Sequence, residues 1–267
     1  VLPEVAEELG LSPETKVVMG AQDQRCASFG AGIDDGIITI SLGTASAICA
    51  IVKEPLIDDQ MKVTCCGLDR DRWMLETVVG TAGVALKWLK NTLFPSCSFR
   101  ELDEQAEQAK PGSNGTMFFP LLSPEDCGDS RGAFEGLSLT TQPCEIIRSV
   151  LEGIAYQIKM HISNMERIGV EAEEIRIFGG GSKSAIWCQI IADITGKRVV
   201  VPRTIETANL GAAIIAGIGC GMFRDFQDAY KIAGGISNSY QPNSENNQFY
   251  AKQYEKYLRL HNRICEG

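Results

Sequence analysis

The segment from Glu174 to Pro202, EIRIFGGGSKSAIWCQIIADITGKRVVVP, constrains the fold more than any other part of the chain. Its pattern predicts a buried strand, a glycine turn, a helix and a second apolar strand. Two strands that are joined through a helix can lie parallel in one sheet, whereas a tight turn makes them antiparallel. The segment therefore predicts a β-α-β unit and, with the helical and strand patterns that alternate elsewhere, an α/β fold.

A long amphipathic helix is predicted before this unit, beginning at Pro143, since proline suits the first helical position. Apolar residues follow at steps of three and four positions, which places them on one face that we expect to be buried. They are Ile146, Ile147, Val150, Leu151, Ile154, Ala155, Ile158, Ile162 and Met165. Two more helices are predicted after the unit. One runs from about Glu206 through LGAAIIAGI, and the other closes the chain in QFYAKQYEKYLRLHNRI.

Strand patterns dominate the first third of the chain. PEVAEELG predicts a short helix that ends at Gly10, and KVVMG predicts a short buried strand. GIITISLGTASAICAIV predicts two strands joined around Leu42, Gly43 and Thr44, and KVTCCGL and RWMLETVVG predict two more, so that we expect a meander of four strands. Helices are predicted next in AGVALKWLKNTL and SFRELDEQAEQA. No linker is long enough to divide the chain.

Composition excludes several classes of protein. The chain has 267 residues, of which 44% are hydrophobic, and this suffices for a substantial core. The net charge of -9 argues against a nucleic-acid partner, because binding phosphates requires clustered Lys and Arg. The most apolar stretch, residues 209–223, is shorter than the about 20 residues of a membrane-spanning helix. We therefore expect a cytoplasmic protein without a membrane segment.

Ten cysteines are scattered along the chain without a CxxC pair. We interpret them as small buried side chains with free thiols, which fits a reducing cytoplasm. A metal site is disfavoured, since neither the cysteine spacing nor a nearby histidine supports it. The two histidines, His161 and His261, lie in helical patterns, where we expect structural roles.

Three turns that contain glycine each follow an apolar strand. In SLGTAS, Gly43 and Thr44 either form an ordinary hairpin or offer backbone N–H groups and a hydroxyl to a phosphate. In GTAGVALKWL, Gly80 and Gly83 precede a helix whose first N–H groups would point outward. Such a helix start is suited to binding an anion, although an ordinary helix start has the same pattern.

The third turn, FGGGSKS, leads from a strand into a helix at residues 178–184. Successive glycines allow the backbone to approach a flat or charged ligand, of which a nucleotide is a common example. The turn is not a Walker A loop, because GxxxxGK[ST] is absent, and the GxGxxG spacing fails at Ser184. An NAD-dependent oxidoreductase built on this turn is therefore disfavoured.

Asp23 stands between Gln22 and Gln24 in GAQDQRCASFGAG. An aspartate at such a place commonly caps the helix that follows. It can also act as a general base, because a carboxylate accepts a proton from a hydroxyl that attacks phosphorus. Both interpretations stay open for Asp23. Two interpretations also stay open for Arg25 and Lys183, which either stabilise charge or are exposed surface residues.

Taken in order, these motifs resemble the C-terminal half of the FGGY family of carbohydrate kinases. The similar segments are VVMGAQDQRCASFGAG, SLGTASAI, TAGVALKWL, RGAFEGLSL, IIRSVLEGIAYQI and FGGGSKSAIWCQIIADITGKRVVVPRTIETANLGAAIIAG, which cover essentially the whole chain. The resemblance implies one lobe of an actin- and hexokinase-like ATPase, which is a ribonuclease-H-like fold with a mixed sheet flanked by helices. Substrates of such enzymes bind in the cleft between two α/β lobes.

The resemblance also implies a reaction, ATP-dependent phosphorylation of a sugar hydroxyl with Mg²⁺. It places the catalytic base and a contact to Mg²⁺ on Asp23, and it leaves Gln22 and Gln24 as candidate contacts to the sugar. The implied nucleotide contacts, of which Lys87 would lie near the adenine, are Gly43, Thr44, Gly83, Lys87, Gly179, Gly180 and Ser184.

The N-terminal lobe of this family begins with an Asp-x-Gly-Thr phosphate loop and supplies most sugar contacts, and no segment here matches it. We therefore expect residues 1–267 to be a C-terminal nucleotide-binding lobe that does not turn over sugar without the other lobe. A ketopentose such as xylulose is the first expectation for the substrate, followed by other pentoses, deoxysugars and polyols. A non-catalytic nucleotide-binding or regulatory module of the same fold, and a homodimer, also remain open.

Overall fold

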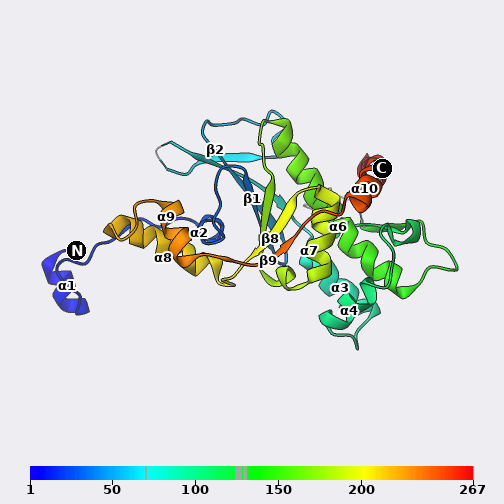
Figure 1. The fold of residues 1–267 in the computed structure, drawn as a ribbon, viewed down its shortest axis with the longest axis horizontal. Coiled ribbons are helices and arrows are strands. Elements are labelled where there is room, and N and C mark those ends of the chain that lie inside the picture. Colours follow the sequence, from blue (N-terminus) through cyan, green and yellow to red (C-terminus); the bar gives the residue numbers. More distant parts are fainter. Residues whose placement is uncertain (70, 124–127, 129–130, 267) are drawn as a thin grey trace.

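The computed structural model describes residues 1–69, 71–123, 128 and 131–266. Figure 1 shows a sheet in the middle of the molecule with helices on both sides. The strands of this sheet are β1 (Ile37–Leu42), β2 (Ser46–Val52), β3 (Thr64–Gly67), β4 (Trp73–Val79), β7 (Glu174–Phe178), β8 (Arg198–Pro202) and β9 (Ile236–Tyr240). A separate antiparallel pair consists of β5 (Met117–Phe119) and β6 (Ala133–Glu135).

The helices follow the patterns predicted from the sequence, with a few additions. The α-helices are α1 (Pro3–Leu9), α2 (Asp23–Gly30), α3 (Gly83–Leu93), α4 (Phe99–Ala106), α6 (Pro143–Arg167), α7 (Ala185–Thr195), α8 (Thr207–Cys220), α9 (Phe226–Ala233) and α10 (Ser244–Glu266). The short 3₁₀ turns are η1 (Ser113–Gly115) and η2 (Gly180–Lys183). Pro143 is the first residue of α6, and Gly10 ends α1 in the left-handed conformation, as predicted.

The main sheet has the order β3-β4-β2-β1-β7-β8-β9. β7 pairs parallel with both β1 and β8, and the other neighbours are antiparallel. The predicted β-α-β unit is confirmed, because β7, α7 and β8 occupy the expected residues. A mixed sheet with a helix between parallel strands is the predicted α/β arrangement.

The predicted meander is wrong in one respect, since β4 lies between β2 and β3. β4 pairs with β2 along seven residues, from Ser46 opposite Val79 to Val52 opposite Trp73. The four residues of β3 are mostly exposed, and this strand therefore takes the edge position. A longer apolar strand buries more surface in the interior of a sheet than a short polar one does.

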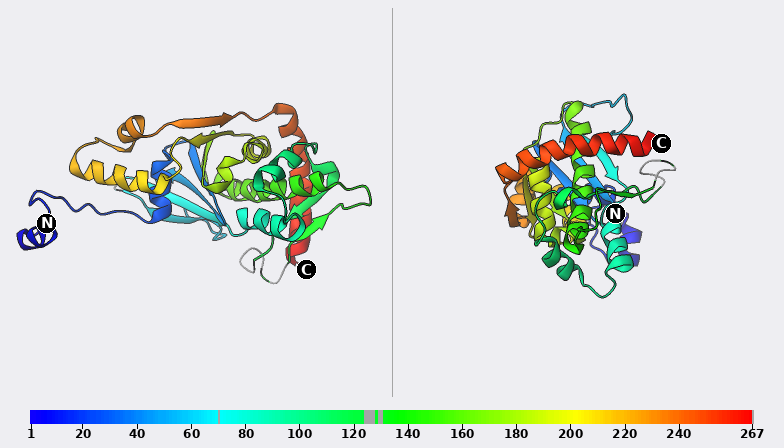
Figure 2. Two further views of the ribbon diagram at one scale, coloured as in Figure 1. Left: turned by 90° about the horizontal axis from the view of Figure 1, so that it is seen from below. Right: turned by 90° about the vertical axis from the view of Figure 1, so that its right-hand side faces the viewer.

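The strand predicted in KVVMG does not form, and this segment is part of an extended arm. No described strand pairs with residues 16–20, and the side chains of Val17 and Met19 are 85% and 88% exposed. The Lys16 ammonium donates to the Cys220 carbonyl at the end of α8 over 3.5 Å. Figure 2 shows α1, beyond this arm, standing away from the body at the end opposite α10.

The two faces of the sheet pack against different helices because successive side chains of a strand point to opposite sides. Ile38 and Ile40 of β1 belong to the large core that includes the apolar face of α6 and residues of α7. Thr39, between them, points the other way and donates a hydrogen bond to Ser28 of α2 over 2.9 Å. Figure 1 shows α2, α8 and α9 on one side of the sheet and α6 and α7 on the other.

Glycine lets α2 and α8 cross with their backbones in contact. A Cβ atom at Gly30 would lie 1.9 Å from the Thr207 carbonyl oxygen, and one at Gly211 would lie 1.8 Å from the Cys26 carbonyl oxygen. Any side chain at either position would therefore push the helices apart. Gly211 of α8 and Gly30 of α2 make this crossing possible, and the crossing fixes the position of α2.

The cysteines only partly match their prediction. Cys49 and Cys188 are buried, and burial raises the pKa of each thiol to about 12, so both stay protonated. Cys66 and Cys220, by contrast, are exposed free thiols. Cys265 is disulfide-bonded, which corrects the prediction of free thiols throughout.

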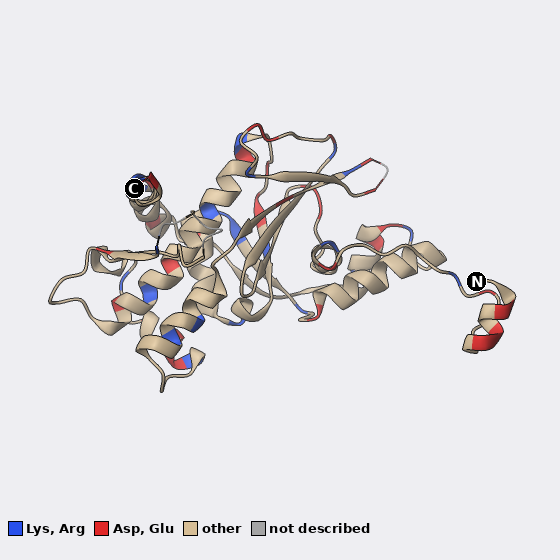
Figure 3. Ribbon diagram, turned by 180° about the vertical axis from the view of Figure 1, so that it is seen from behind, with Lys and Arg blue, Asp and Glu red and all other residues tan. Residues whose placement is uncertain are grey.

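Charge is distributed unevenly along the molecule. Figure 3 shows acidic residues on α1 and a mixture of both signs over the body. Three glutamates, Glu4, Glu7 and Glu8, lie in the seven residues of α1. In the described parts of the chain, no helix is both long enough and apolar enough to cross a membrane.

Candidate functional site

A pocket of about 680 Å³ lies at the carboxyl end of β1, and its walls come from four parts of the chain. These are the turn between β1 and β2, the first turns of α3, the helix α4, and the η2 turn with the start of α7. Six of the seven predicted nucleotide contacts line it: Gly43, Thr44, Gly83, Lys87, Gly180 and Ser184. The fold thus brings three glycine turns, far apart in sequence, to one cavity.

The first corner of the pocket joins the β1–β2 turn to α3. The Gly83 N–H donates to the Gly43 carbonyl over 2.8 Å, and the N–H groups of Ala82 and Val84 both donate to the Thr44 carbonyl over 3.2 Å. A Cβ atom at Gly83 would lie 2.4 Å from the Gly43 carbonyl oxygen, so the contact requires glycine. The expectation that the first N–H groups of this helix point outward is therefore wrong for these three residues.

The second corner joins α4 to the start of α7. The Ser184 hydroxyl accepts the Trp187 N–H over 3.2 Å and so caps α7. The same hydroxyl donates to Oδ1 of Asp103 over 2.9 Å. Burial raises the pKa of Asp103, because desolvation of its carboxylate outweighs the hydrogen bond from Ser184.

The η2 turn forms the wall between these corners. Gly179 has a φ of +92°, which favours glycine, and it precedes the lining residues without lining the pocket itself. A Cβ atom at Gly181 would lie 2.5 Å from the Leu42 side chain, whereas one at Gly180 would meet open space. The backbone of η2 therefore lies directly on the end of β1 and leaves Gly180 free towards the cavity.

Charge and apolar surface are both available in the pocket. Lys87 and Lys183 line it, and neither forms an ion pair with another described residue. Arg100 also lines it and pairs with Glu104 on α4 over 2.9 Å. The apolar lining is Leu42, Val84, Leu86, Phe99 and Trp187. Such a cavity suits a ligand with an apolar ring and a negative group.

Asp23 lies outside this pocket, at the start of α2. It is the first helical residue and not the N-cap, which is Gln22 without a side-chain cap. The exposed Asp23 carboxylate accepts the Gln24 N–H over 2.8 Å through Oδ1. The capping interpretation is thus corrected to a contact within the first turn. Arg25 donates to the Gly67 carbonyl of β3 over 3.4 Å, so its guanidinium is partly engaged.

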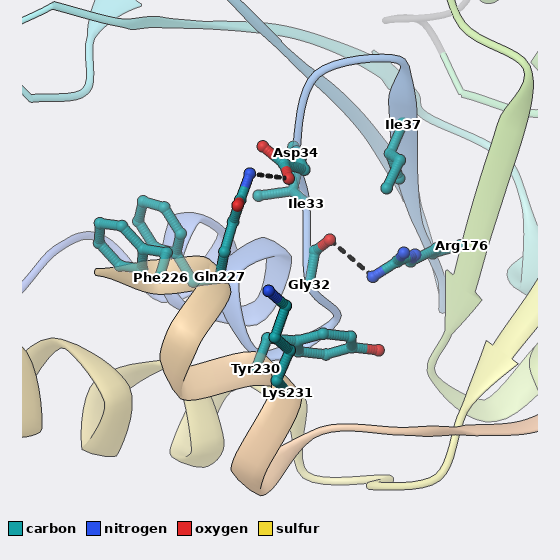
Figure 4. Close-up of a pocket in the computed structure, with 10 residues that line it drawn as sticks. Gly32, Ile33, Asp34, Ile37, Arg176, Phe226, Gln227, Tyr230 and Lys231 are labelled. Atoms are coloured by element: carbon teal, nitrogen blue, oxygen red, sulfur yellow. Dashed lines mark hydrogen bonds between the residues drawn. The ribbon is translucent and has the colours of Figure 1, made fainter. Parts of the chain in front are cut away.

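A second cavity, of about 230 Å³, lies at the other end of β1 beside α9. Figure 4 shows that its polar groups bind one another, since Arg176 donates to the Gly32 carbonyl and Gln227 donates to Asp34, both over 2.7 Å. The Arg176 guanidinium also lies 5.0 Å from the centre of the Tyr230 ring. These contacts stabilise the packing of α9 on the sheet.

The sequence pattern of the FGGY family of carbohydrate kinases, C-terminal domain, matches residues 38–220, which is more than half of the chain. The chain belongs to the FGGY family. The resemblance seen in the motifs is therefore confirmed, and an NAD-dependent oxidoreductase is no longer a competing interpretation. The matched region of this FGGY chain includes all three glycine turns and excludes α2 with Asp23.

Relatives of this FGGY chain include two kinds of sugar kinase. A xylulose kinase of Staphylococcus epidermidis is 33% identical over 264 residues, which are 96% of this chain and 53% of that protein. A gluconokinase of Bacillus licheniformis is 29% identical over 274 residues, which are 97% of this chain and 52% of that protein. This FGGY chain thus spans about half the length of the curated relatives it matches.

The solved structures support the fold. A ligand-bound xylulose kinase from Lactobacillus acidophilus superposes with a TM-score of 0.91 at 27% identity, over 98% of this chain and 55% of that one. The fold is therefore that of the actin- and hexokinase-like ATPases, as expected. Trp187 and Asp103 are pocket residues that the sequence reasoning missed, because an ordinary amphipathic helix contains such residues without any motif around them.

Proposed function

We propose that this FGGY domain binds ATP and supplies the catalytic base for transfer of the γ-phosphoryl group to a sugar hydroxyl. The observation that carries the proposal is the pocket of about 680 Å³ in which the turns at Gly43, Gly83 and Gly180 meet. Glycine keeps side chains out of the way of the phosphates, and Lys87 and Lys183, which form no ion pair with a described residue, add positive charge.

The proposed nucleotide contacts divide between the two corners of the pocket. The phosphates would lie at the corner formed by Gly43, Thr44 and Gly83, where no bulky side chain blocks their approach. The adenosine would lie beside Gly180 and Ser184, with Lys87 near the adenine, while Gly179, which does not line the pocket, would act by shaping the turn. Positioning and charge stabilisation supply most of the catalysis in phosphoryl transfer, so these backbone groups matter as much as a base does.

Asp23 would accept the proton of the attacking sugar hydroxyl. Its carboxylate is exposed and, among the described residues, only the Gln24 N–H donates to it, so an oxygen is available to a substrate. Gln22 and Gln24 flank it and are the nearest candidates for contacts to the sugar. Because α2 is held by its close crossing with α8, the base has a defined position.

The described residues fit Mg²⁺ in the way this ion usually binds to kinases. They contain no cluster of three or more His, Cys, Asp or Glu that could hold a metal by itself. Mg²⁺ commonly takes one or two carboxylates and fills its other positions with phosphate oxygens and water. Asp23 could provide such a carboxylate. When bound, the ion would neutralise charge on the phosphates.

The sugar is proposed to bind between this domain and a second lobe. The curated relatives are about twice as long as this chain, which supports a further lobe in the working enzyme. A pentulose such as xylulose is the first candidate because of the 33% identity to a xylulose kinase, and gluconate is the second because of the gluconokinase. Other pentoses, deoxysugars and polyols follow. A cytoplasmic setting fits such metabolites.

The decisive variant for this function is Asp23→Asn in the complete enzyme. We expect sugar phosphorylation to fall by about 100-fold or more, because general base catalysis is lost, while ATP affinity stays unchanged. Turnover is measured as ADP release in the presence of xylulose or gluconate, and ATP affinity is measured by calorimetry. Near-normal turnover would exclude Asp23 as the base. ATP binding by a wild-type protein that phosphorylates none of the sugars would favour the non-catalytic module instead.

A further inference from the structure

One acidic side chain, Asp103, is among the residues that line the proposed nucleotide pocket. It lies on α4, between the buried residue Leu102 and the exposed residue Glu104, and its carboxylate reaches Ser184 across the pocket wall. A carboxylate in a nucleotide site is unexpected, since it repels phosphates. The part of the nucleotide next to Asp103 must therefore be one that a carboxylate attracts.

The Asp103 carboxylate has an unused acceptor. Its Oδ1 accepts the Ser184 hydroxyl over 2.9 Å, and no described residue donates a hydrogen bond to Oδ2. Burial raises the pKa of Asp103, which means that the single hydrogen bond does not compensate for the loss of water. A ligand that brings an N–H donor to Oδ2 would remove this deficit.

The surroundings of Asp103 select the ligand group that can provide this donor. The phosphates belong at the Gly43 and Gly83 corner, which the β1–β2 turn and α3 build, and Asp103 belongs to the other corner, which α4 and α7 build. The aromatic residues Phe99 and Trp187 come from those same two helices and line the pocket. A flat base fits beside them, since aromatic and apolar walls bind base rings well.

We propose that Asp103 makes the pocket selective for adenine, by accepting a hydrogen bond from the exocyclic amino group of the base. This inference rests on the proposed binding of ATP. An amino group is a pure donor and matches an ionised carboxylate, which is a pure acceptor. Hypoxanthine and guanine carry a carbonyl oxygen at that position, and two acceptors facing each other leave both without a partner. Asp103 is thus a specificity-determining residue.

Calorimetry with ATP and with inosine triphosphate, ITP, tests this inference on the complete enzyme. We expect the wild type to bind ATP about tenfold or more tightly than ITP, because ITP would displace water from the Asp103 acceptor without bringing a donor to it. Asp103→Asn keeps an oxygen for the Ser184 hydroxyl and turns an N–H₂ donor towards the base. In this variant the ATP-to-ITP preference should disappear or reverse, and a thermal melt verifies that the variant is folded.

The matched control is Glu107→Gln, which removes a charge just beyond α4 from a residue that does not line the pocket. It should keep the wild-type preference for ATP.

Equal affinities of the wild type for ATP and ITP would overturn the role of Asp103 without any variant, while the proposed function would stand. Binding of neither nucleotide would overturn the proposed function itself. If Asp103→Asn changes the discrimination against 2′-deoxy-ATP and not against ITP, the carboxylate contacts the ribose and the inference is wrong.

Discussion

Asp58 illustrates how one carboxylate holds a loop on the surface of this domain. Its oxygens accept the backbone N–H groups of Gln60, Lys62 and Val63 over 3.1, 2.8 and 3.0 Å. The guanidinium of Arg167, at the end of α6, lies 2.5 Å away. The hydrogen bond from Arg167 is the main cause that lowers the pKa of Asp58 to about 2. The ionised form therefore stabilises the folded state.

A pH-dependent stability follows from this carboxylate. Because the pKa of Asp58 is lower in the folded state than in the unfolded chain, its contribution is complete above the unfolded value of about 4 and disappears as the pH falls towards about 2. We predict that Asp58→Asn lowers the melting temperature at pH 7 and that its difference from wild type shrinks as the pH falls from 4 to 2. Melting curves by circular dichroism measure both.

The exposed neighbour Asp59 provides the control for that experiment. Its side chain is 87% exposed and pairs with the same Arg167 over 3.3 Å. Asp59→Asn should change the melting temperature at pH 7 much less, since exposed ion pairs contribute little. A stability difference between wild type and Asp58→Asn that persists at pH 2 would contradict this account.

Single residues also show what sequence could and could not predict about the site. Gly43, Gly83 and Gly180 stood out because glycine after an apolar strand indicates a close approach or an accessible backbone, and all three line one pocket. Asp103 gave no such signal. Its significance arises from contact with Ser184, which is 81 positions further along the chain. Contacts of this kind depend on how helices pack, which local patterns do not record.

At the scale of elements, the crossing of α2 and α8 links stability to the proposed base. The helices approach so closely at Gly211 that a Cβ atom there would lie 1.8 Å from the Cys26 carbonyl oxygen. We predict that Gly211→Ala destabilises the protein by about 1–3 kcal/mol, as overpacking usually does. It should also shift Asp23 and reduce sugar turnover, while ATP affinity should stay within about twofold, because no residue of α2 lines the pocket.

The measurement for this crossing combines denaturant unfolding with steady-state kinetics and ATP calorimetry. Gly67→Ala serves as the control, because a Cβ atom at Gly67 would meet open space. That variant should leave stability and turnover close to wild type. Unchanged turnover in Gly211→Ala would show that the position of α2 does not matter for the reaction.

Elements with strong periodicity were predictable, and those defined by their neighbours were not. Local sequence pattern and steric limits predict three features. They are the apolar face of α6, the β-α-β unit from Glu174 to Pro202 and the cap at Gly10. Two other features depend on which surfaces of the folded chain cover one another. They are the position of β4 between β2 and β3 and the exposed arm at residues 16–20. The apolar residues 17–19 would be buried only if another part of the protein covered them, and local sequence does not show whether it does.

At the scale of the whole molecule, the carboxyl end of the central parallel pair organises the candidate site. β1 and β7 lie side by side and parallel, so the turns that follow them, at Gly43 and Gly179, emerge at the same end of the sheet. Ligands of α/β proteins commonly bind where the carboxyl ends of strands meet. This topology explains why motifs more than 130 positions apart in sequence share one pocket.

A crystal structure of the protein with ADP and Mg²⁺ tests the central claim most directly, namely that the three glycine turns form a nucleotide site. We predict that the phosphates lie beside Gly43, Thr44 and Gly83, and that the base lies between the η2 turn and α4, next to Ser184. ADP bound anywhere outside the pocket of about 680 Å³ would contradict the account, as would a base that lies at the glycine corner with its phosphates directed towards Asp103.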